Sequence, residues 1–271
     1  KKSLSCSSPN TSSRASSERV TELAAGLLSL GLQPEDRVAI ASNTRLEWIF
    51  FDLAIMAAGG ATTTVYPSTN ADDVAFILSD SGSRIVIAED AKQLGKLNDQ
   101  RGSIPAVEKV VLIDTTGVDL SSRGDDWVIT SDDLAGRGRA LLDSDADAVT
   151  RATDAVRPES LATLIYTSGT TGRPKGVELT QSNWTYEAAS IEGLGLLRPD
   201  QLQFLWLPLS HSFGKVLLSA QLQIGFTSAV DGRVDKIVDN LAIINPNFMA
   251  GAPLIYENVY ALVVSMQSAE G

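Results

Sequence analysis

Hydrophobic and polar positions alternate between a helical and an extended period from Glu18 onward. Val20, Leu23 and Leu27 fall on one face at helical spacing, and Arg37 to Ala41 has the composition of a short buried strand. Further strands are expected over 62–65, 84–88, 110–113, 127–129, 161–166, 203–206, 225–230 and 247–250. Further helices are expected over 46–58, 72–78, 181–193, 212–223, 233–243 and 254–266. Strands that recur roughly every 25 residues with helices between them predict an α/β fold of layered, mostly parallel sheets flanked by helices.

Two stretches interrupt this alternation. Residues 1–17 are rich in serine and poor in apolar side chains, which predicts a disordered or added leader. Residues 114–160 are acidic and contain few long apolar runs, so we expect a solvated excursion there and a boundary near residue 155. The chain is accordingly divided into a first α/β subdomain over 18–155 and a second over 156–271, which begins with the loop described below.

Charge and composition exclude or disfavour several classes of function. The 271 residues include 22 Lys and Arg against 33 Asp and Glu, a net charge of −11, which disfavours broad nucleic-acid binding because phosphate neutralisation needs basic side chains. Cys6 is the only cysteine, which excludes an internal disulfide and is typical of a reducing, cytoplasmic compartment. The most apolar stretch, 53–71, contains Gly59, Gly60 and Pro67, so no transmembrane helix is predicted; peripheral membrane contact stays open.

One segment carries candidate chemistry. The expected strand 161–166 runs directly into Thr167-Ser168-Gly169-Thr170-Thr171-Gly172-Arg173-Pro174-Lys175-Gly176, which combines glycines, hydroxyl side chains and a lysine. Glycines allow close backbone approach, N–H and O–H groups donate hydrogen bonds, and the lysine supplies a positive charge, so the segment predicts a phosphate cradle. It is not a Walker A loop, because Lys175 is followed by Gly176 rather than Ser or Thr. The alternative interpretation is a glycine- and threonine-rich turn with a surface lysine.

The segment from Tyr166 to Val177 resembles the signature loop of the adenylate-forming enzymes, the superfamily of acyl- and aryl-CoA ligases, nonribosomal adenylation domains and luciferases. The resemblance covers most of residues 18–271 and includes Tyr66-Pro67 and the run from Leu207 to His211. Residues 231–260 are similar to bacterial long-chain fatty acyl-CoA synthetases, although Leu254 stands where an arginine often follows the proline. The resemblance implies part of the large N-terminal domain of such an enzyme.

The resemblance also implies a reaction and its site residues. A long-chain fatty acid would react with Mg²⁺-ATP to give acyl-AMP, and CoA would then displace AMP, as in an AMP-forming long-chain fatty acid-CoA ligase of lipid metabolism. Seven loop residues would bind the β- and γ-phosphates: Thr167, Ser168, Gly169, Thr170, Thr171, Gly172 and Lys175. Lys175 and His211 are the catalytic candidates, Thr167 would join the magnesium shell, and Arg173 is expected to face solvent. Lys215 occupies the position of the gating aromatic of some long-chain synthetases.

Several alternatives stay open. The segments that bind adenine and ribose in such ligases, and their C-terminal lysine, are not found in the sequence, so we expect this N-terminal portion to be incomplete as a catalyst by itself. A catalytically incompetent nucleotide-binding or interaction fragment is the alternative from a different functional class. An adenylating enzyme for another carboxylic acid, or one that transfers to a carrier protein, is a further alternative.

Overall fold

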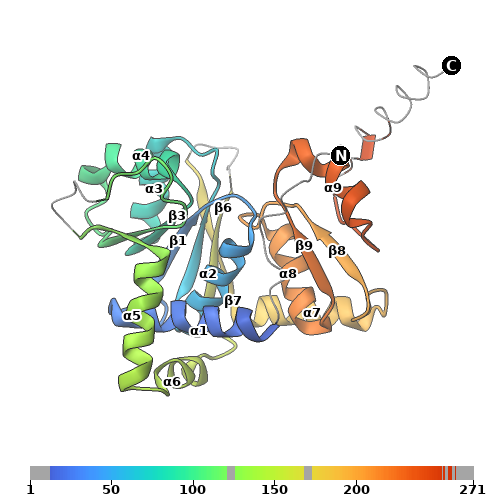
Figure 1. Cartoon of the computed structure of the whole chain (residues 1–271), viewed down its shortest axis with the longest axis horizontal. Helices are drawn as coiled ribbons and strands as arrows, with labels where there is room; N and C mark the ends of the chain where they lie inside the picture. The colour runs from blue at the N-terminus through green and yellow to red at the C-terminus, as the bar shows by residue number, and fades with distance from the viewer. Residues whose placement is uncertain are drawn as a thin grey trace. The chain divides into compact units, whose positions relative to one another are not determined.

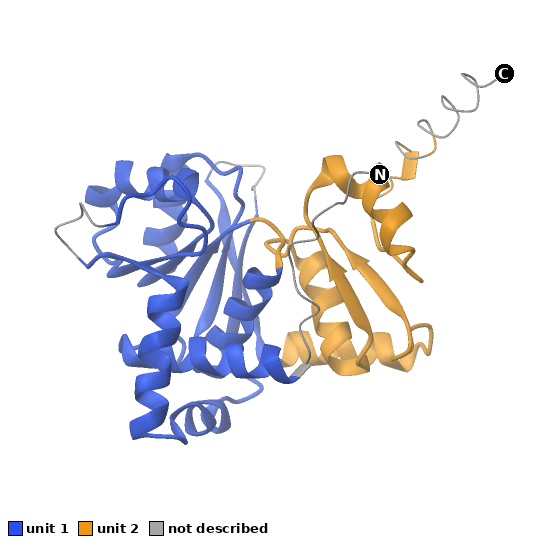
Figure 2. Ribbon diagram, viewed as in Figure 1, with its two compact units in different colours: residues 1–42, 46–181 blue, residues 43–45, 182–271 orange. Residues whose placement is uncertain are grey.

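The computed structural model describes residues 13–120, 126–167 and 173–251, together with Pro253, Tyr256, Glu257 and Tyr260. The chain divides into two compact units: unit 1 comprises 1–42 and 46–181, and unit 2 comprises 43–45 and 182–271 (Figure 2). The division therefore lies after residue 181 instead of near the expected 155. The physical reason is strand pairing, because residues 161–167 pair with the first sheet and extend unit 1 beyond the expected boundary.

Unit 1 is built on one seven-stranded sheet with the order β5-β4-β3-β1-β2-β6-β7 (Figure 1). Its strands are β1 (Arg37–Ala41), β2 (Ala61–Val65), β3 (Ile85–Ala88), β4 (Lys109–Leu112), β5 (Val128–Thr130), β6 (Leu161–Thr167) and β7 (Lys175–Thr180). Every neighbouring pair is parallel except β6 and β7, which are antiparallel. The mostly parallel sheet confirms the predicted fold class, whereas the strand β7 was not predicted.

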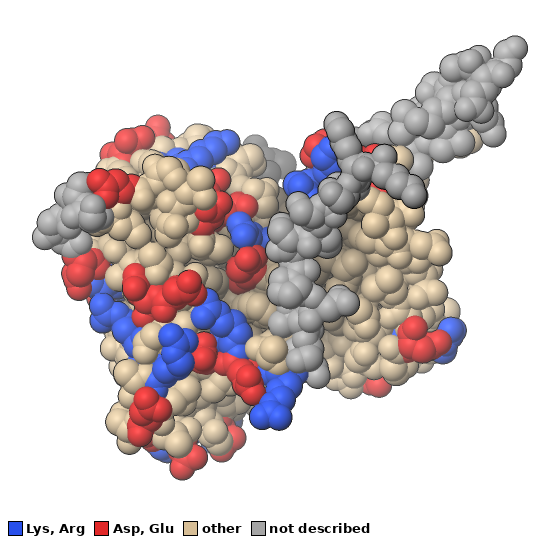
Figure 3. Space-filling model, in the orientation of Figure 1, with Lys and Arg blue, Asp and Glu red and all other residues tan. Residues whose placement is uncertain are grey.

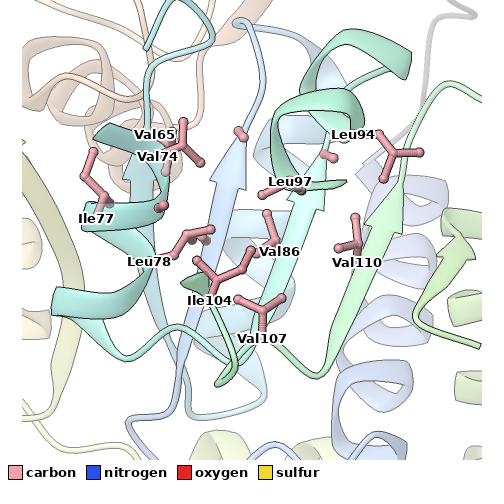
Figure 4. Close-up of a cluster of buried hydrophobic side chains, with 14 of the residues drawn as sticks. Val65, Val74, Ile77, Leu78, Val86, Leu94, Leu97, Ile104, Val107 and Val110 are labelled. Carbon is pink, nitrogen blue, oxygen red and sulfur yellow. The ribbon is translucent and has the colours of Figure 1, made fainter. Parts of the chain in front are cut away.

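Helices cover both faces of this sheet. In the strand order, the connection from β1 to β2 moves toward the β7 edge of the sheet, whereas the connections from β2 to β3 and from β3 to β4 move toward the β5 edge. Because such crossovers are right-handed, α2 (Leu46–Ala57) lies on one face, and α3 (Ala71–Ser81) and α4 (Ala91–Asp99) lie on the opposite face. Figure 4 shows the core beneath α3 and α4, where Leu78 and Leu97 pack against the strands near Val86. A short 3-10 helix, Arg101–Ser103, follows α4.

The expected leader and the expected solvated excursion are both partly helical. Helix α1 (Ser13–Ser29) begins inside the predicted leader, where Arg14 and Glu18 form an ion pair of 3.0 Å one turn apart; residues 1–12 lie outside the described part. Helices α5 (Ser131–Ser144) and α6 (Ala148–Ala155) occupy the acidic stretch. Helix α5 buries Leu134, Ala135 and Gly138. The solvated-excursion prediction is thus wrong for this part, because three buried positions at helical spacing suffice to fix a short amphipathic helix.

Helices α1 and α5 approach each other closely. A Cβ atom built on Gly138 would lie 1.9 Å from the carbonyl oxygen of Glu22, and one built on Gly26 would lie 2.4 Å from that of Leu134. Both positions therefore require glycine. An ion pair flanks the crossing, with Arg19 2.9 Å from Asp132. On the face drawn in Figure 3, the basic side chains of unit 1 lie among acidic ones.

Unit 2 contains a parallel two-stranded sheet, β8 (Leu202–Leu205) and β9 (Thr227–Val230), joined by α8 (Ser212–Ile224). Helix α7 (Gln181–Gly193), which begins at the last residue of unit 1, a 3-10 turn (Val234–Lys236) and α9 (Ile237–Ile244) complete its described elements. The expected strand 247–250 forms a single bridge, Gln203 with Phe248. The expected helix 254–266 falls largely outside the described residues. In the described part of the chain, no helix has both the length and the apolar character needed to cross a bilayer.

Candidate functional site

The predicted phosphate loop joins the two strands of an antiparallel hairpin. Strand β6 ends at Thr167 and β7 begins at Lys175, and these two residues face each other in the pairing register. Both are exposed. Lys175 is thus the first residue of a strand rather than part of a free loop, so its backbone is fixed by strand pairing. The candidates Ser168, Gly169, Thr170, Thr171 and Gly172 lie outside the described residues.

The base of the hairpin is held by Tyr166. Its register partner across the strands is Gly176, and a Cβ atom on Gly176 would lie 3.0 Å from Cζ of the tyrosine ring. The ring therefore covers the glycine, an arrangement in which an aromatic side chain compensates for the missing side chain of its neighbour. The Tyr166 hydroxyl donates a hydrogen bond of 2.7 Å to Oδ2 of Asp80 on α3. Burial of the phenol, together with this carboxylate, raises the pKa of Tyr166, so the hydroxyl stays a donor at neutral pH.

Arg173 follows the loop and contacts the same helix. Its guanidinium carbon lies 5.0 Å from the centroid of the Phe76 ring, within the range of a cation–π contact. Arg173 is exposed, as expected, but its guanidinium lies against an aromatic ring instead of being surrounded by water alone. An open cavity of about 260 Å³ also borders the hairpin base, lined by Arg37, Asp80, Tyr166 and Glu178 among others. Its two carboxylates make it unsuited to a triphosphate.

His211 is the N-cap residue of α8 in unit 2. Its Nδ1 accepts a hydrogen bond of 3.2 Å from the backbone N–H of Phe213, so a neutral ring carries its proton on Nε2. The side chain is exposed, which leaves an Nε2–H donor for a ligand. A histidine that caps a helix is a sufficient structural explanation by itself, and its role toward a substrate stays a prediction.

The turn before His211 is fixed from two sides. Thr44 is buried, and its hydroxyl donates to the carbonyl of Leu207 at 2.7 Å and accepts from the N–H of Leu209 at 3.1 Å. Nothing in the local sequence around Thr44 indicates this contact with residues more than 160 positions away. On the other side, a Cβ atom on Gly214 would lie 2.4 Å from the carbonyl oxygen of Pro208. The start of α8 can approach the turn only because residue 214 is glycine.

Lys215 lies one turn into α8 and is buried, with an exposed fraction of 1%. Its Nζ lies 5.2 Å from the centroid of the Trp184 ring on α7. The position expected to correspond to a gating aromatic therefore holds a buried lysine stacked on an aromatic side chain. This contact keeps the ammonium within unit 2.

The predicted site residues fall into two groups. Thr167, Arg173 and Lys175 are brought together by the hairpin of unit 1, and His211 belongs to unit 2. Within the described residues, no cluster of three or more His, Cys, Asp or Glu side chains could hold a metal ion. Thr167, the predicted magnesium ligand, ends β6, and its role toward a metal ion stays a prediction.

The comparisons with known proteins agree with one another. A family model described as AMP-binding enzyme matches residues 9–270. The long-chain-fatty-acid-CoA ligase FadD15 of Mycobacterium tuberculosis is 34% identical over 248 residues, which cover 89% of this chain and 38% of that protein. The same ligase of Mycobacterium bovis gives the same values. This chain thus spans well under half the length of these curated relatives.

Solved structures show the same fold at low identity. A long-chain-fatty-acid CoA ligase described as putative, from Rhodopseudomonas palustris, matches with a TM-score of 0.74 at 23% identity, over 92% of this chain and 58% of that one. The anthranilate CoA ligase AuaEII, solved with anthranoyl-AMP, matches with a TM-score of 0.72 at 19% identity, over 90% of this chain and 45% of that one. The observed sheet and helices are thus shared with parts of these two CoA ligases.

Proposed function

Because this chain belongs to the AMP-binding enzyme family, we propose that it is part of an AMP-forming ligase that activates a long-chain fatty acid. The relatives at 34% identity carry the name of that activity, which favours a fatty acid over other acids. In the proposed reaction, a carboxylate oxygen of the acid attacks the α-phosphorus of ATP, and the bond to the β-phosphate breaks. Acyl-AMP forms and pyrophosphate leaves. The thiol of CoA then attacks the acyl carbon, loses its proton and displaces AMP.

The hairpin of unit 1 supports the first step. Lys175 presents an ammonium group next to the end of β6, where Thr167 presents a hydroxyl. We propose that these two residues, with Ser168, Gly169, Thr170, Thr171 and Gly172, bind the β- and γ-phosphates and stabilise the negative charge that develops on the leaving pyrophosphate. A magnesium ion, when bound, would neutralise phosphate charge, with Thr167 as its proposed protein ligand.

His211 suits the other reactant. We propose that its Nε2–H donates to a carboxylate oxygen of the acid and orients that oxygen for attack. The imidazole would act by hydrogen bonding, since its Nδ1 already accepts from the backbone of α8. A cytoplasmic location with peripheral membrane contact also stays a proposal, and it suits a substrate that partitions between water and lipid.

The main support for the proposal is the pairing of Lys175 with Thr167, the last pair of the hairpin before the loop. It is tested by acid-dependent release of pyrophosphate from ATP, measured on the polypeptide of the full reading frame with saturated acids of increasing chain length. We expect release that depends on a long-chain acid. Release with short or aromatic acids alone would favour an adenylating enzyme for another acid, and no release with any acid would favour a nucleotide-binding or interaction role.

Lys175→Gln removes the charge and keeps most of the side-chain length. A hydrogen bond to a charged group contributes about 1.5–3 kcal/mol, so we expect kcat/KM for ATP to fall about 10- to 100-fold. Lys92→Gln on α4 is the matched control, because Lys92 is also an exposed lysine of unit 1. Equal activity of the two variants would exclude Lys175 from phosphate binding.

A further inference from the structure

The two ends of the phosphate loop contact one helix. Tyr166, directly before Thr167, is hydrogen-bonded to Asp80, and Arg173, directly after Gly172, lies over Phe76. Phe76 and Asp80 are four residues apart on α3 and therefore share one face of the helix. Residues distant in sequence thus meet on a short stretch of α3, beside the hairpin formed by β6 and β7.

Helix α3 is itself firmly held, which makes it a suitable support. Asn70 caps its first turn by accepting from the N–H of Asp73 at 2.9 Å, and Gly82 ends it in the left-handed conformation. Its carbonyl at Ser81 accepts from Nε of Arg37 on β1 at 2.6 Å. Figure 4 shows the buried face of the helix, where Ile77 and Leu78 point into the core. The helix therefore has little freedom to move with the hairpin.

Neither contact makes a large contribution to stability. Asp80 is exposed, so solvent screening reduces its hydrogen bond from the roughly 1.5–3 kcal/mol of a charged acceptor to about 1 kcal/mol, and the cation–π contact to the half-buried Phe76 contributes about 0.5–1 kcal/mol. The sheet and the buried face of α3 contribute far more to stability. Each contact is therefore better suited to fixing the direction of the hairpin than to stabilising unit 1.

We propose that Asp80 and Phe76 are positioning residues for the phosphate loop: α3 anchors the loop at both ends and so orients Thr167 and Lys175 toward the triphosphate. This inference rests on the function proposed above. Asp80 acts through Tyr166, and Phe76 acts through Arg173, and neither needs to touch a substrate. Loss of either anchor is expected to widen the range of hairpin orientations, which raises the KM for ATP while the fold persists.

The test compares Tyr166→Phe and Asp80→Ala with the matched control Asp72→Ala, since alanine removes the acceptor oxygen that asparagine would keep. Asp72 is also an exposed carboxylate of α3, and it also accepts one side-chain hydrogen bond, from Nε2 of Gln100 at 2.6 Å. Among the described residues, no hydrogen bond or ion pair joins Asp72 to β6 or β7. Tyr166→Phe keeps the ring over Gly176 and removes only the hydroxyl. Two quantities are measured: hydrogen exchange of the β7 backbone amides without nucleotide, and the KM for Mg²⁺-ATP in pyrophosphate release.

We expect Tyr166→Phe and Asp80→Ala each to speed exchange in β7 and to raise the KM for ATP about three- to tenfold. The double variant is expected to be no worse than either single one, because both changes remove the same bond. Asp72→Ala is expected to change neither quantity, and thermal midpoints are expected to agree within a few degrees for all of them. Unchanged exchange and KM in the Asp80 variant, or equal effects of Asp72→Ala, would overturn the proposal.

The second anchor is tested by Phe76→Leu and Arg173→Ala. If Arg173 acts through Phe76, the two single variants and their double variant give similar increases in KM. A larger loss for Arg173→Ala that persists without Phe76 would show that Arg173 binds phosphate directly, and would overturn this half of the proposal. Absence of acid-dependent pyrophosphate release by the wild type would refute the proposed function, while exchange in β7 would still report on the anchors.

Discussion

The close crossing of α1 and α5 makes Gly138→Ala a sharp test of the structure. The added methyl group would lie 1.9 Å from the Glu22 carbonyl oxygen, whereas ordinary contact begins at 3.4 Å. The helices must therefore separate by about 1.5 Å, or the residue must distort. Overpacking of this kind costs about 1–3 kcal/mol, and a clash with backbone lies at the upper end because a backbone oxygen cannot rotate away. Alanine returns about 1 kcal/mol through its higher helix propensity.

The net expectation for Gly138→Ala is a loss of about 2 kcal/mol, or a fall of about 4–8 °C in the thermal midpoint of a unit of this size. Gly136→Ala on the same helix is the control, because its methyl group would meet only Nη2 of Arg139, at 3.7 Å. That variant is expected to gain about 0.5–1 kcal/mol from helix propensity. Both midpoints are measured by far-ultraviolet circular dichroism. Equal shifts, or shifts of the same sign, would refute the close packing of α5 on α1.

Two further expectations concern unit 2. His211→Ala is expected to raise the KM for the fatty acid about three- to tenfold and to leave the KM for ATP unchanged, because the proposed hydrogen bond is to the carboxylate of the acid. Both KM values are measured by steady-state pyrophosphate release. Equal increases in the two KM values would indicate a structural histidine. Hydrogen bonds from Arg233, and also one from Asn240, lower the pKa of Asp231 from 3.8 to about 2. Because its folded pKa is depressed, its contribution to stability is present above pH 4 and is lost as the pH falls toward 2. The free energy of unfolding is measured by denaturation at pH 6 and at pH 2.5. Asp231→Asn is expected to make the loss of this free energy between the two pH values smaller by about 1 kcal/mol, after allowance for solvent screening. An unchanged loss would contradict the role assigned to Asp231.

The sequence predicts the parallel strands well because each is a short apolar run bounded by turn residues. The strand 37–41, for example, is found with its expected ends. Strand β7 was missed because it lies at the edge of the sheet and is mostly exposed, so Lys175 to Thr180 has no apolar run. Helix α5 was missed for a different reason. It packs through Gly138 and Ala135, and small residues produce little hydrophobic signal in the sequence even where the packing is tight.

The candidate site shows the same limit. Local composition indicates that the segment around Lys175 binds phosphate, because glycine, hydroxyl and lysine occur together there. The contact of Tyr166 with Asp80 spans 86 residues, and that of Thr44 with Leu207 spans 163. No periodicity or spacing in one sequence reports such pairs. They become visible only when the strand order of the sheet and the start of α8 are known.

The central claim is that the acid is activated as an acyl-adenylate, and transfer of oxygen tests it most directly. A long-chain fatty acid labelled with ¹⁸O in its carboxylate is incubated with ATP, Mg²⁺ and CoA and the polypeptide of the full reading frame, and the products are analysed by mass spectrometry. Attack on the α-phosphorus predicts one ¹⁸O atom in AMP and unlabelled pyrophosphate. Unlabelled AMP, or ADP together with ¹⁸O in inorganic phosphate, would contradict the account, because the carboxylate would then not have attacked the α-phosphate.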